Sequence, residues 1–423
     1  AITVANNLLS SIIDNHIYFG NELQIEKVVW KRCLDLNDRQ LRKVNTGLSG
    51  EKNIVSREDE FCITVASEIM AIVCLAKDIY DLKRRLGNII IGYNKEKKPI
   101  YAKDLKAEGA MAVLLKDAIK PNLVQTLEHT PTIIHGGPFA NIAHGCNSII
   151  ATKLAMKLSE YVVTEAGFGA DLGAEKFFDI KCRKAQIIPN IVVIVATIKA
   201  MKYHGGIDKE HVQEKNIMAI KEGIKNLYTH IDNIKNVFKA KVVVALNHYA
   251  NDDTEEIDIV KDCLEERSVP FYLVDGWEKG GEGAMEISRE ITKDEYNSPN
   301  LNFVYQDNDT IKEKIEKVAT KIYRAKSVNY SDEALEEIKK IESMGYSNLP
   351  ICIAKTQYSF SDDAKNVKSE GEYNITVKKV ELKAGAEFIV VIAGNIMTMP
   401  GLPKIPAAEK IDINENGKIE GIF

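Results

Sequence analysis

Hydrophobic residues in this chain fall into two kinds of pattern, of which the first is a short run that is apolar at nearly every position. The clearest runs are 191–197 and 242–246. Strands that are covered by helices on both faces are apolar throughout, so these runs predict buried strands of a parallel sheet. Shorter apolar runs at 88–93, 132–134 and 271–274 predict further strands.

The second pattern has apolar residues at helical spacing and fills most of the chain between these runs. It begins at Ile2 and continues to Ile13. Between residues 252 and 267, the apolar side chains Ile257, Val260 and Leu264 share one face, and acidic residues occupy the other. We interpret the acidic face as solvated. Alternation of strands and helices predicts an α/β fold with a mostly parallel sheet.

The pattern changes in the last quarter of the chain. A charged helical stretch follows Tyr330, and 374–382 and 387–393 then have the alternating or continuous apolar character of a hairpin or small sheet. A chain of 423 residues is longer than one hydrophobic core usually supports. We therefore predict an α/β core at 1–325, with room for an inserted domain, and a smaller α+β domain at 326–423.

Composition narrows the classes of function. The net charge is −5, and Lys and Arg are scattered along the chain, which gives no electrostatic indication of nucleic-acid binding. No apolar run reaches the length of about 18 residues that a membrane span needs. The seven cysteines are odd in number and never form a CxxC pair, which predicts reduced thiols in a cytoplasmic protein. Small-molecule chemistry fits these features best.

A polar loop rich in glycine, 135–148, follows the predicted strand at 132–134. Gly136 and Gly145 allow a close approach of backbone to a ligand. His135 and His144 lack a third ligand at a suitable spacing, so we predict no metal site here. Packing and hydrogen bonding within a tight loop explain each histidine better.

A second glycine-rich turn, Gly167-Phe168-Gly169, follows residues 161–164, for which the apolar pattern predicts a strand. A helix is predicted to begin near Ala174. Backbone amides at the start of a helix suit a phosphate or a carboxylate. The spacing from Gly169 to Gly173 departs by one residue from a dinucleotide-binding fingerprint, which leaves a nicotinamide-dependent oxidoreductase as a minor alternative.

Polar and aromatic residues follow the next two predicted strands. Asn247 and Tyr249 come after 242–246, and Trp277 comes after 271–274. Ligands of open α/β sheets bind beyond the carboxyl ends of the strands, so these residues are expected at one crevice. Tyr249 and Trp277 are candidates to stack on a flat ring, and Asn247 is a candidate to hydrogen-bond a heterocycle. Packing explains either aromatic residue equally well when it is considered alone.

Two lysines, Lys199 and Lys202, follow the strand predicted at 191–197, and we interpret them as solvated. The 423 residues contain no Gly-x-x-x-x-Gly-Lys-Ser/Thr phosphate loop, no Gly-x-Ser-x-Gly elbow and no His-Glu-x-x-His zinc helix. The residues by themselves therefore predict an α/β protein with glycine-rich ligand loops.

Several long strings of unusual composition carry a more specific signal. These strings are 120–127, 135–147, 164–177, 195–206, 279–283, 354–359 and 397–404. In them the chain resembles the formate–tetrahydrofolate ligase family, and the resemblance extends over its whole length.

This resemblance implies an ATP-dependent ligase of one-carbon metabolism with a fold related to phosphate-loop hydrolases. Its members phosphorylate formate to formyl phosphate, which tetrahydrofolate attacks to give 10-formyltetrahydrofolate. ATP with Mg²⁺, a monovalent cation and a cytoplasmic homotetramer are implied as well. Tyr249 and Trp277 match the positions that hold the pterin ring, Asn247 is assigned to the nucleotide side, and Gly167, Phe168 and Gly169 are assigned to the neighbourhood of formyl phosphate.

Two signatures of that family are absent from the sequence: a Gly-Glu-Gly-Lys-Thr phosphate loop and a Gly-Gly-Ala-Ala-Gly-Gly-Gly-Tyr segment. Both belong upstream of the position that Ala1 matches. The resemblance therefore leads us to expect an amino-terminally truncated ligase that is inactive by itself. A non-catalytic module that binds folate is the alternative.

Overall fold

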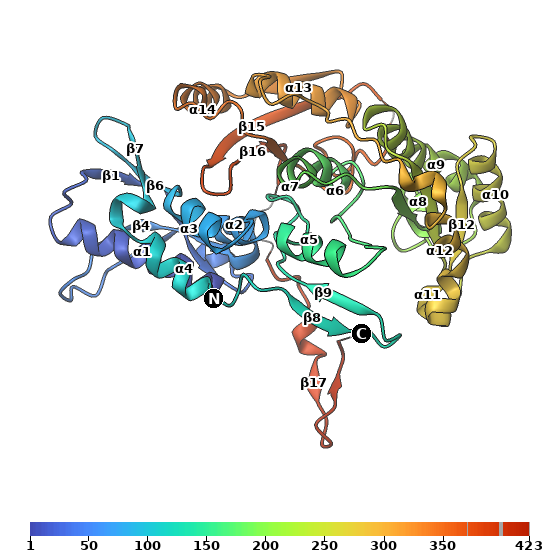
Figure 1. Cartoon of the computed structure of the whole chain (residues 1–423), viewed down its shortest axis with the longest axis horizontal. Coiled ribbons are helices and arrows are strands. Elements are labelled where there is room, and N and C mark those ends of the chain that lie inside the picture. The colour runs from blue at the N-terminus through green and yellow to red at the C-terminus, as the bar shows by residue number, and fades with distance from the viewer. Residues whose placement is uncertain (370, 397–400, 423) are drawn as a thin grey trace.

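The computed structural model describes residues 1–369, 371–396 and 401–422. Figure 1 shows helices and small sheets distributed along the molecule, with a hairpin near the carboxyl end that projects from the body. Within the described ranges, no helix combines the length and the apolar character needed to cross a membrane.

The elements agree with an α/β fold. The α-helices are α1 Ile2–Tyr18, α2 Glu68–Leu75, α3 Ile79–Gly87, α4 Glu108–Leu115, α5 Ile149–Leu158, α6 Gly173–Lys176, α7 Arg183–Ala185, α8 Ile198–His204, α9 Ile217–Asp232, α10 Thr254–Glu265, α11 Gly276–Lys279, α12 Met285–Ile291, α13 Ile311–Lys321 and α14 Asp332–Ser343. The strands are β1 Ile25–Val28, β2 Arg32–Leu34, β3 Val44–Thr46, β4 Arg57–Asp59, β5 Phe61–Ile63, β6 Ile90–Asn94, β7 Pro99–Tyr101, β8 Asn122–Gln125, β9 Pro131–Ile134, β10 Val192–Ala196, β11 Val242–Asn247, β12 Phe271–Val274, β13 Ser327–Tyr330, β14 Ile351–Ala354, β15 Asn374–Lys383, β16 Phe388–Ala393, β17 Asp412–Ile413 and β18 Ile419–Glu420.

The strands β10, β11 and β12 form a sheet that is parallel throughout. Val244 and Leu246 of β11 face a core that includes Ile224 of α9 and Val260 of α10. Val243, on the opposite face, packs with residues of α12. Helices therefore cover both faces of this sheet, which explains why its strands are apolar at nearly every position.

A mixed sheet lies in the carboxyl-terminal part of the chain, for which the sequence predicts a smaller α+β domain. The largest sheet has the order β13-β15-β16-β14 and is mixed: β15 and β16 are antiparallel, whereas the β13–β15 and β14–β16 pairs are parallel. A connection of only a few residues joins Lys383 to Phe388, and so short a loop permits only antiparallel pairing. The remaining sheets have two or three strands.

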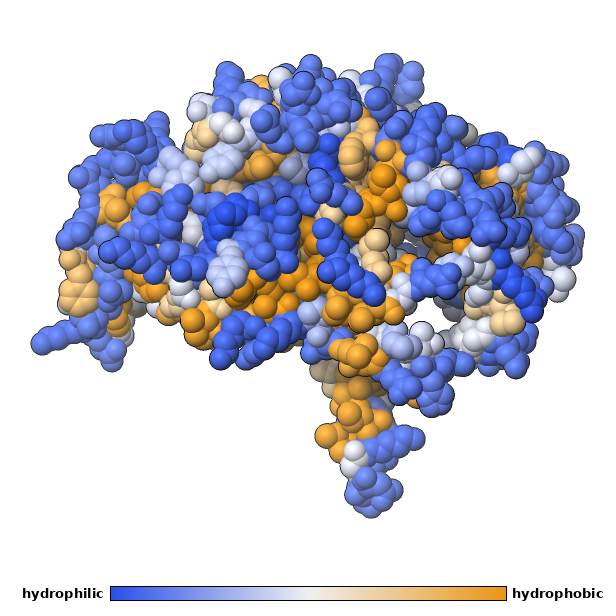
Figure 2. Space-filling view, viewed as in Figure 1, coloured by the Kyte–Doolittle hydropathy of each residue, from blue (hydrophilic) through white to orange (hydrophobic). Residues whose placement is uncertain are grey.

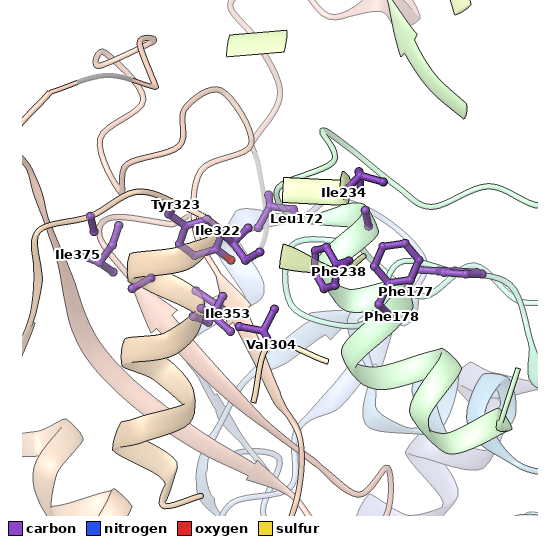
Figure 3. Close-up of a cluster of buried hydrophobic side chains, with 14 of the residues drawn as sticks. Leu172, Phe177, Phe178, Ile234, Phe238, Val304, Ile322, Tyr323, Ile353 and Ile375 are labelled. Carbon is purple, nitrogen blue, oxygen red and sulfur yellow. The ribbon is translucent and has the colours of Figure 1, made fainter. Parts of the chain in front are cut away.

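The mixed sheet lies between two hydrophobic cores. In β16, Ile389 and Val391 belong to one core cluster, and Phe388 and Val390 belong to the other, because side chains alternate between the faces of a strand. Figure 3 shows part of the first cluster, including Phe178 and several aliphatic residues. This cluster contains residues from both sides of the boundary drawn at 325. The division into domains stays a prediction.

The second core contains the amino-terminal helix that the spacing of apolar residues predicts. Ala5, Leu9 and Ile13 of α1 are fully buried in this core. The predicted acidic helix is also present as α10, with Val260 and Leu264 buried. All seven cysteines are free, and five of them are buried.

The strand predicted at 161–164 is wrong, and the string at 397–404 is described only in part. Residues 161–164 form no strand, because the structure gives this extended segment no pairing partner. Residues 397–400 of the proline-containing string at 397–404 lie outside the described residues. Beyond them the chain reaches the projecting β17–β18 hairpin. Figure 2 shows apolar residues on this arm, where Ile413 and Ile419 are exposed.

Candidate functional site

The carboxyl ends of β10, β11 and β12 form one edge of the parallel sheet. Asn247 is the last residue of β11, and its Cα pairs with the Cα of Val274 at the end of β12. The backbone N–H of His248 then donates to the carbonyl of Val274 over 2.9 Å. The structure therefore places Asn247 directly beside the start of the loop that carries Trp277, as parallel pairing requires.

A tight turn after β11 presents Tyr249 at this edge. The N–H of Tyr249 donates to Oδ2 of Asp252 over 2.9 Å, and the N–H of Asp252 donates to the Tyr249 carbonyl over 2.8 Å. The Nζ atom of Lys199, at the start of α8, lies 4.1 Å from the centroid of the Tyr249 ring. Tyr249 is 41% exposed, so the ring retains surface for a ligand while a cation stabilises it.

Trp277 lies in α11, and its side chain is 95% exposed. The loop beneath it is fixed at Asp275, whose N–H donates to the carbonyl of Gly283 over 3.0 Å. The Asp275 carboxylate pairs with Lys279 at 2.8 Å, and this ammonium lowers the pKa of Asp275 below its usual value. Among the described residues, Tyr249 and Trp277 make no ring-to-ring contact. The two rings thus share an edge without touching.

The hairpin formed by β8 and β9 contacts the loop that follows Trp277. Gly280 has φ +56°, and a Cβ atom added there would lie 2.0 Å from Oε1 of Glu128. The Glu128 carboxylate is therefore in close contact with the Gly280 backbone. This contact brings the hairpin tip to the same edge of the site as Trp277.

The glycine-rich turn at 167–169 is held by backbone contacts. The N–H of Gly167 donates to the carbonyl of Gly145 over 3.1 Å. The N–H groups of Leu172 and Gly173 donate to the Gly169 carbonyl. Gly173 leaves no room for a side chain, because an added Cβ would lie 2.3 Å from the Gly167 carbonyl oxygen. The turn leads directly into α6, but no strand precedes it, as a dinucleotide fingerprint requires.

Phe168 has φ +65°, a left-handed conformation that is uncommon for a residue with a side chain. Its ring is 45% exposed. Such a conformation persists only where neighbouring structure holds it. The contacts of this turn involve the 140–145 loop rather than Asn247, Tyr249 or Trp277.

Ionisable side chains are buried beside this turn. Burial tends to raise the pKa of Asp171, but the Lys355 ammonium outweighs burial, and the pKa is lower than usual. Burial raises the pKa of Glu175 well above its ordinary value and raises the pKa of Asp179 to about 7. Burial also lowers the pKa of His230. The turn therefore adjoins a protein interior in which charge is costly.

Helix α8 connects the two groups of candidate residues. Lys199 near its start contacts Tyr249. Burial lowers the pKa of His204, at the end of the helix, to about 4, and His230 and Asp171 are its ionisable neighbours. Five residues of α-helix rise by about 7.5 Å. Tyr249 at the sheet edge and the buried ionisable residues beside the 167–169 segment are thus connected by little more than one turn of α8.

The interpretation of Lys199 and Lys202 as solvated is wrong for Lys202. Its ammonium is buried and pairs with Glu256 of α10 at 2.8 Å. It also donates to the carbonyl of Glu214 over 2.9 Å. A buried lysine stem and a carboxylate from a distant helix give no local signal in the sequence. Lys199 lies on the Tyr249 ring instead.

The two histidines of the 135–148 loop are both buried. His135 is buried between the Ser148 hydroxyl, at 2.6 Å from Nδ1, and the Ala118 carbonyl, at 2.7 Å from Nε2. His144 is fully buried, and burial lowers its pKa to about 3. In the part of the chain that the structure describes, no group of three or more His, Cys, Asp or Glu residues is arranged to hold a metal ion.

Three residues of this region escape prediction from the sequence. Glu128 contacts Gly280 from a remote hairpin, and the Asp171–Lys355 pair joins residues that are distant in the chain. Hydrophobic periodicity does not indicate such contacts. A weak signal exists for Lys355 alone, because a lysine directly follows the apolar run of β14.

The chain matches the model of a known protein family over its whole length. The family described as formate–tetrahydrofolate ligase matches residues 1–423. The chain therefore belongs to the formate–tetrahydrofolate ligase family.

Proposed function

We propose that this protein ligates formate to tetrahydrofolate at the expense of ATP. A formate oxygen attacks the γ-phosphorus of ATP, which yields formyl phosphate and ADP. The amine of tetrahydrofolate then attacks the formyl carbon, phosphate leaves, the amine loses a proton and 10-formyltetrahydrofolate forms. The observation that carries this proposal is the family match over residues 1–423.

Tyr249 and Trp277 are proposed to hold the pterin ring. They follow neighbouring parallel strands, and both side chains are exposed at the same edge of the sheet. Aromatic faces on two adjacent loops suit a flat heterocycle. Asn247 is the last residue of β11, directly before the turn that carries Tyr249, and is proposed to hydrogen-bond the nucleotide.

The Gly167-Phe168-Gly169 turn is proposed to lie near formyl phosphate. It leads into α6, so its geometry presents backbone near a helix start, where anions are stabilised. ATP is expected to bind with Mg²⁺, which neutralises phosphate charge, and a monovalent cation is expected to activate the enzyme. The cytoplasmic location also stays a prediction.

The exposed apolar arm is proposed to contact another copy of the chain in a homotetramer. Ile413 and Ile419 lie on the projecting hairpin at 65% and 56% exposure. Exposed apolar residues that cluster on one feature are typical of interfaces. Light scattering is expected to show a tetramer that dissociates after Ile413→Lys and Ile419→Lys substitution, and a wild-type monomer would contradict it.

A second candidate function is folate binding without ligation. It is favoured by the absence of a Gly-x-x-x-x-Gly-Lys-Ser/Thr string from the 423 residues, because phosphate loops of this type grip the triphosphate. This candidate uses the same aromatic pair, Tyr249 and Trp277.

One set of measurements separates the two candidates. Formate, MgATP and tetrahydrofolate are supplied to the purified protein, and phosphate release and 10-formyltetrahydrofolate are measured. Formate-dependent release of both products supports ligation and eliminates the binding module. Calorimetric binding of tetrahydrofolate with no turnover supports the module, and the absence of both contradicts both proposals.

A further inference from the structure

Lys355 is a buried cation with a complete set of acceptors. It directly follows β14, and its side chain is 0% exposed. The ammonium donates to Oδ2 of Asp171 over 2.8 Å, to the carbonyl of Thr356 over 3.2 Å and to the carbonyl of Ser359. An ammonium has three protons, so these three acceptors satisfy it.

The acceptors of Lys355 come from two separate parts of the chain. Thr356 and Ser359 belong to the loop after β14, whereas Asp171 belongs to the segment between the glycine-rich turn and α6. Asp171 is 6% exposed. A Cβ atom added to Gly169 would lie 2.8 Å from Oδ1 of Asp171, so this carboxylate is packed against the turn itself.

A side chain of α9, His230, contacts both of these segments. The rings of His230 and Phe360 lie 4.6 Å apart between centroids, and Phe360 is in the loop that Lys355 anchors. A Cβ atom at Gly169 would also lie 3.8 Å from Cε1 of His230. His230 therefore packs between the turn and that loop, but its contacts are those of ring packing and carry no direct hydrogen bond to Asp171.

A buried ion pair is a costly way to join two loops, because both charges lose their hydration. A hydrophobic pair of similar size often gives equal or greater stability. An ion pair instead fixes the relative positions of its partners, since the hydrogen bonds of Lys355 hold Asp171 Oδ2 and two carbonyl oxygens in one arrangement. The neighbouring Phe168, at φ +65°, needs such restraint.

We propose that Lys355 is a positioning residue for the acyl-phosphate site, which fixes the Gly167–Gly169 turn through its buried ion pair with Asp171. This role rests on the proposed function of the turn. Lys355 does not touch the reacting atoms in this arrangement. It acts through Asp171, whose carboxylate packs against Gly169.

The test separates positioning from simple stability. Lys355→Met and Asp171→Leu are made singly and together. Each single substitution leaves one buried partner without its counter-charge and is expected to lower the urea midpoint of unfolding. The double substitution removes both charges and is expected to recover most of that midpoint.

Hydrogen exchange of the amides at 166–173, read by mass spectrometry, reports on the turn. In the double variant, exchange at these amides is expected to accelerate about tenfold, although global stability is recovered. A tenfold acceleration corresponds to a decrease of about 1.4 kcal/mol in the free energy of local opening. Unchanged exchange at 166–173 would overturn the proposal.

Lys314→Met is a matched control. Lys314 is also fully buried, and its ammonium donates to the carbonyls of Ser347 and Leu349 over 2.6 and 3.0 Å. This variant is expected to lose stability without faster exchange at 166–173. Equal acceleration in Lys314→Met would show a general loosening and would contradict a specific role for Lys355.

Kinetics give a second readout in the whole protein. The double variant is expected to lose at least tenfold in kcat for ligation, with the KM for tetrahydrofolate unchanged, because the contacts of the 167–169 turn do not involve Tyr249 or Trp277. An unchanged kcat would also overturn the proposal. If the unaltered protein shows no formate-dependent turnover, the proposed function fails, and amide exchange alone decides whether Lys355 positions the turn.

Discussion

Lys202 and Glu256 form a buried ion pair that joins α8 to α10. The Nζ atom of Lys202 lies 2.8 Å from Oε2 of Glu256, and the side chains are 4% and 0% exposed. The second carboxylate oxygen accepts the backbone N–H of Asn216 over 2.6 Å. Because α8 also carries Lys199 beneath Tyr249, this pair supports one wall of the candidate site.

Glu256→Gln is expected to destabilise the protein by about 3 kcal/mol, because a buried ammonium loses its counter-charge. The free energy of unfolding in urea measures this loss. The neighbouring Glu255 pairs with Lys215 at the surface, where both side chains are exposed. Glu255→Gln is expected to cost less than about 0.5 kcal/mol. Equal losses in the two variants would contradict a special role for the buried pair.

Side chains at the exposed sheet edge could be predicted from the sequence because local pattern determines them. Runs that are apolar at nearly every position define β11 and β12, and parallel pairing brings Asn247 and Trp277 to a common edge. The apolar pattern at 161–164 is similar over a shorter length, but no neighbouring strand pairs with it. Pairing depends on the rest of the fold, which the pattern does not contain.

The buried charges could not be predicted for the same reason. A lysine at a strand end reads as solvated, and only tertiary structure shows that Lys202 and Lys355 each meet a carboxylate from a remote segment. The antiparallel pairing of β15 and β16 agrees with the hairpin that the sequence predicts there, whereas the parallel β13–β15 and β14–β16 pairs join strands that are separated in the chain and leave no local signal. The sequence pattern gives strand positions more readily than strand directions.

Trp277→Ala is expected to weaken tetrahydrofolate binding about tenfold, because one stacking face disappears. Stability is expected to change little, since the side chain is 95% exposed. Calorimetric titration measures binding, and thermal unfolding checks the fold. Tyr80→Ala is the control, because Tyr80 is 82% exposed and lies on α3, away from the sheet edge. A binding loss in the control as large as that in Trp277→Ala would remove the assignment.

Tyr249→Phe is expected to keep tetrahydrofolate binding within about twofold, whereas Tyr249→Ala loses about tenfold, because only the ring face is required. A phenylalanine ring at position 249 keeps the face on which Lys199 lies, whose Nζ atom is 4.1 Å from the Tyr249 ring centroid in the wild type. The same calorimetric titration measures these variants. A large loss in Tyr249→Phe would show that the hydroxyl, rather than the ring, contacts the ligand.

His144 is expected to make stability depend on pH. Burial lowers its pKa from 6.5 to about 3, so the folded protein holds the neutral ring. Above pH 6.5 neither state binds the proton, and this group has no effect. Between pH 6.5 and about 3 the unfolded chain binds it more readily, so stability falls by up to about 1.4 kcal/mol per pH unit.

Urea unfolding of wild type and His144→Met between pH 7.5 and 4.5 isolates this contribution. The variant is expected to lose less stability than wild type as pH falls, and the difference between the two grows toward low pH. His129→Met is the control, because His129 lies exposed at the β8–β9 tip. Parallel curves for wild type and His144→Met would show that His144 does not determine the response.

Gly280→Ala is expected to destabilise the Trp277 loop by about 1–3 kcal/mol. Gly280 has φ +56° and ψ −137°, a combination that side chains oppose strongly. The nearest obstacle to a Cβ atom, at 2.0 Å, is the Glu128 carboxylate, which is the end of a flexible side chain and can move. The backbone conformation, more than the contact, should therefore determine the cost.

Two further variants separate these causes. Gly276 lies at the start of the same loop, and a Cβ atom added there has no neighbour within 4 Å. Gly276→Ala is therefore expected to leave stability nearly unchanged. Adding Glu128→Ala to Gly280→Ala removes the contact and leaves the backbone cost. Full recovery of stability in that double variant would show that the contact with Glu128, rather than the conformation of Gly280, is what requires glycine. Because this loop carries Trp277, Gly280→Ala is also expected to weaken tetrahydrofolate binding, and this loss should persist when Glu128 is replaced as well.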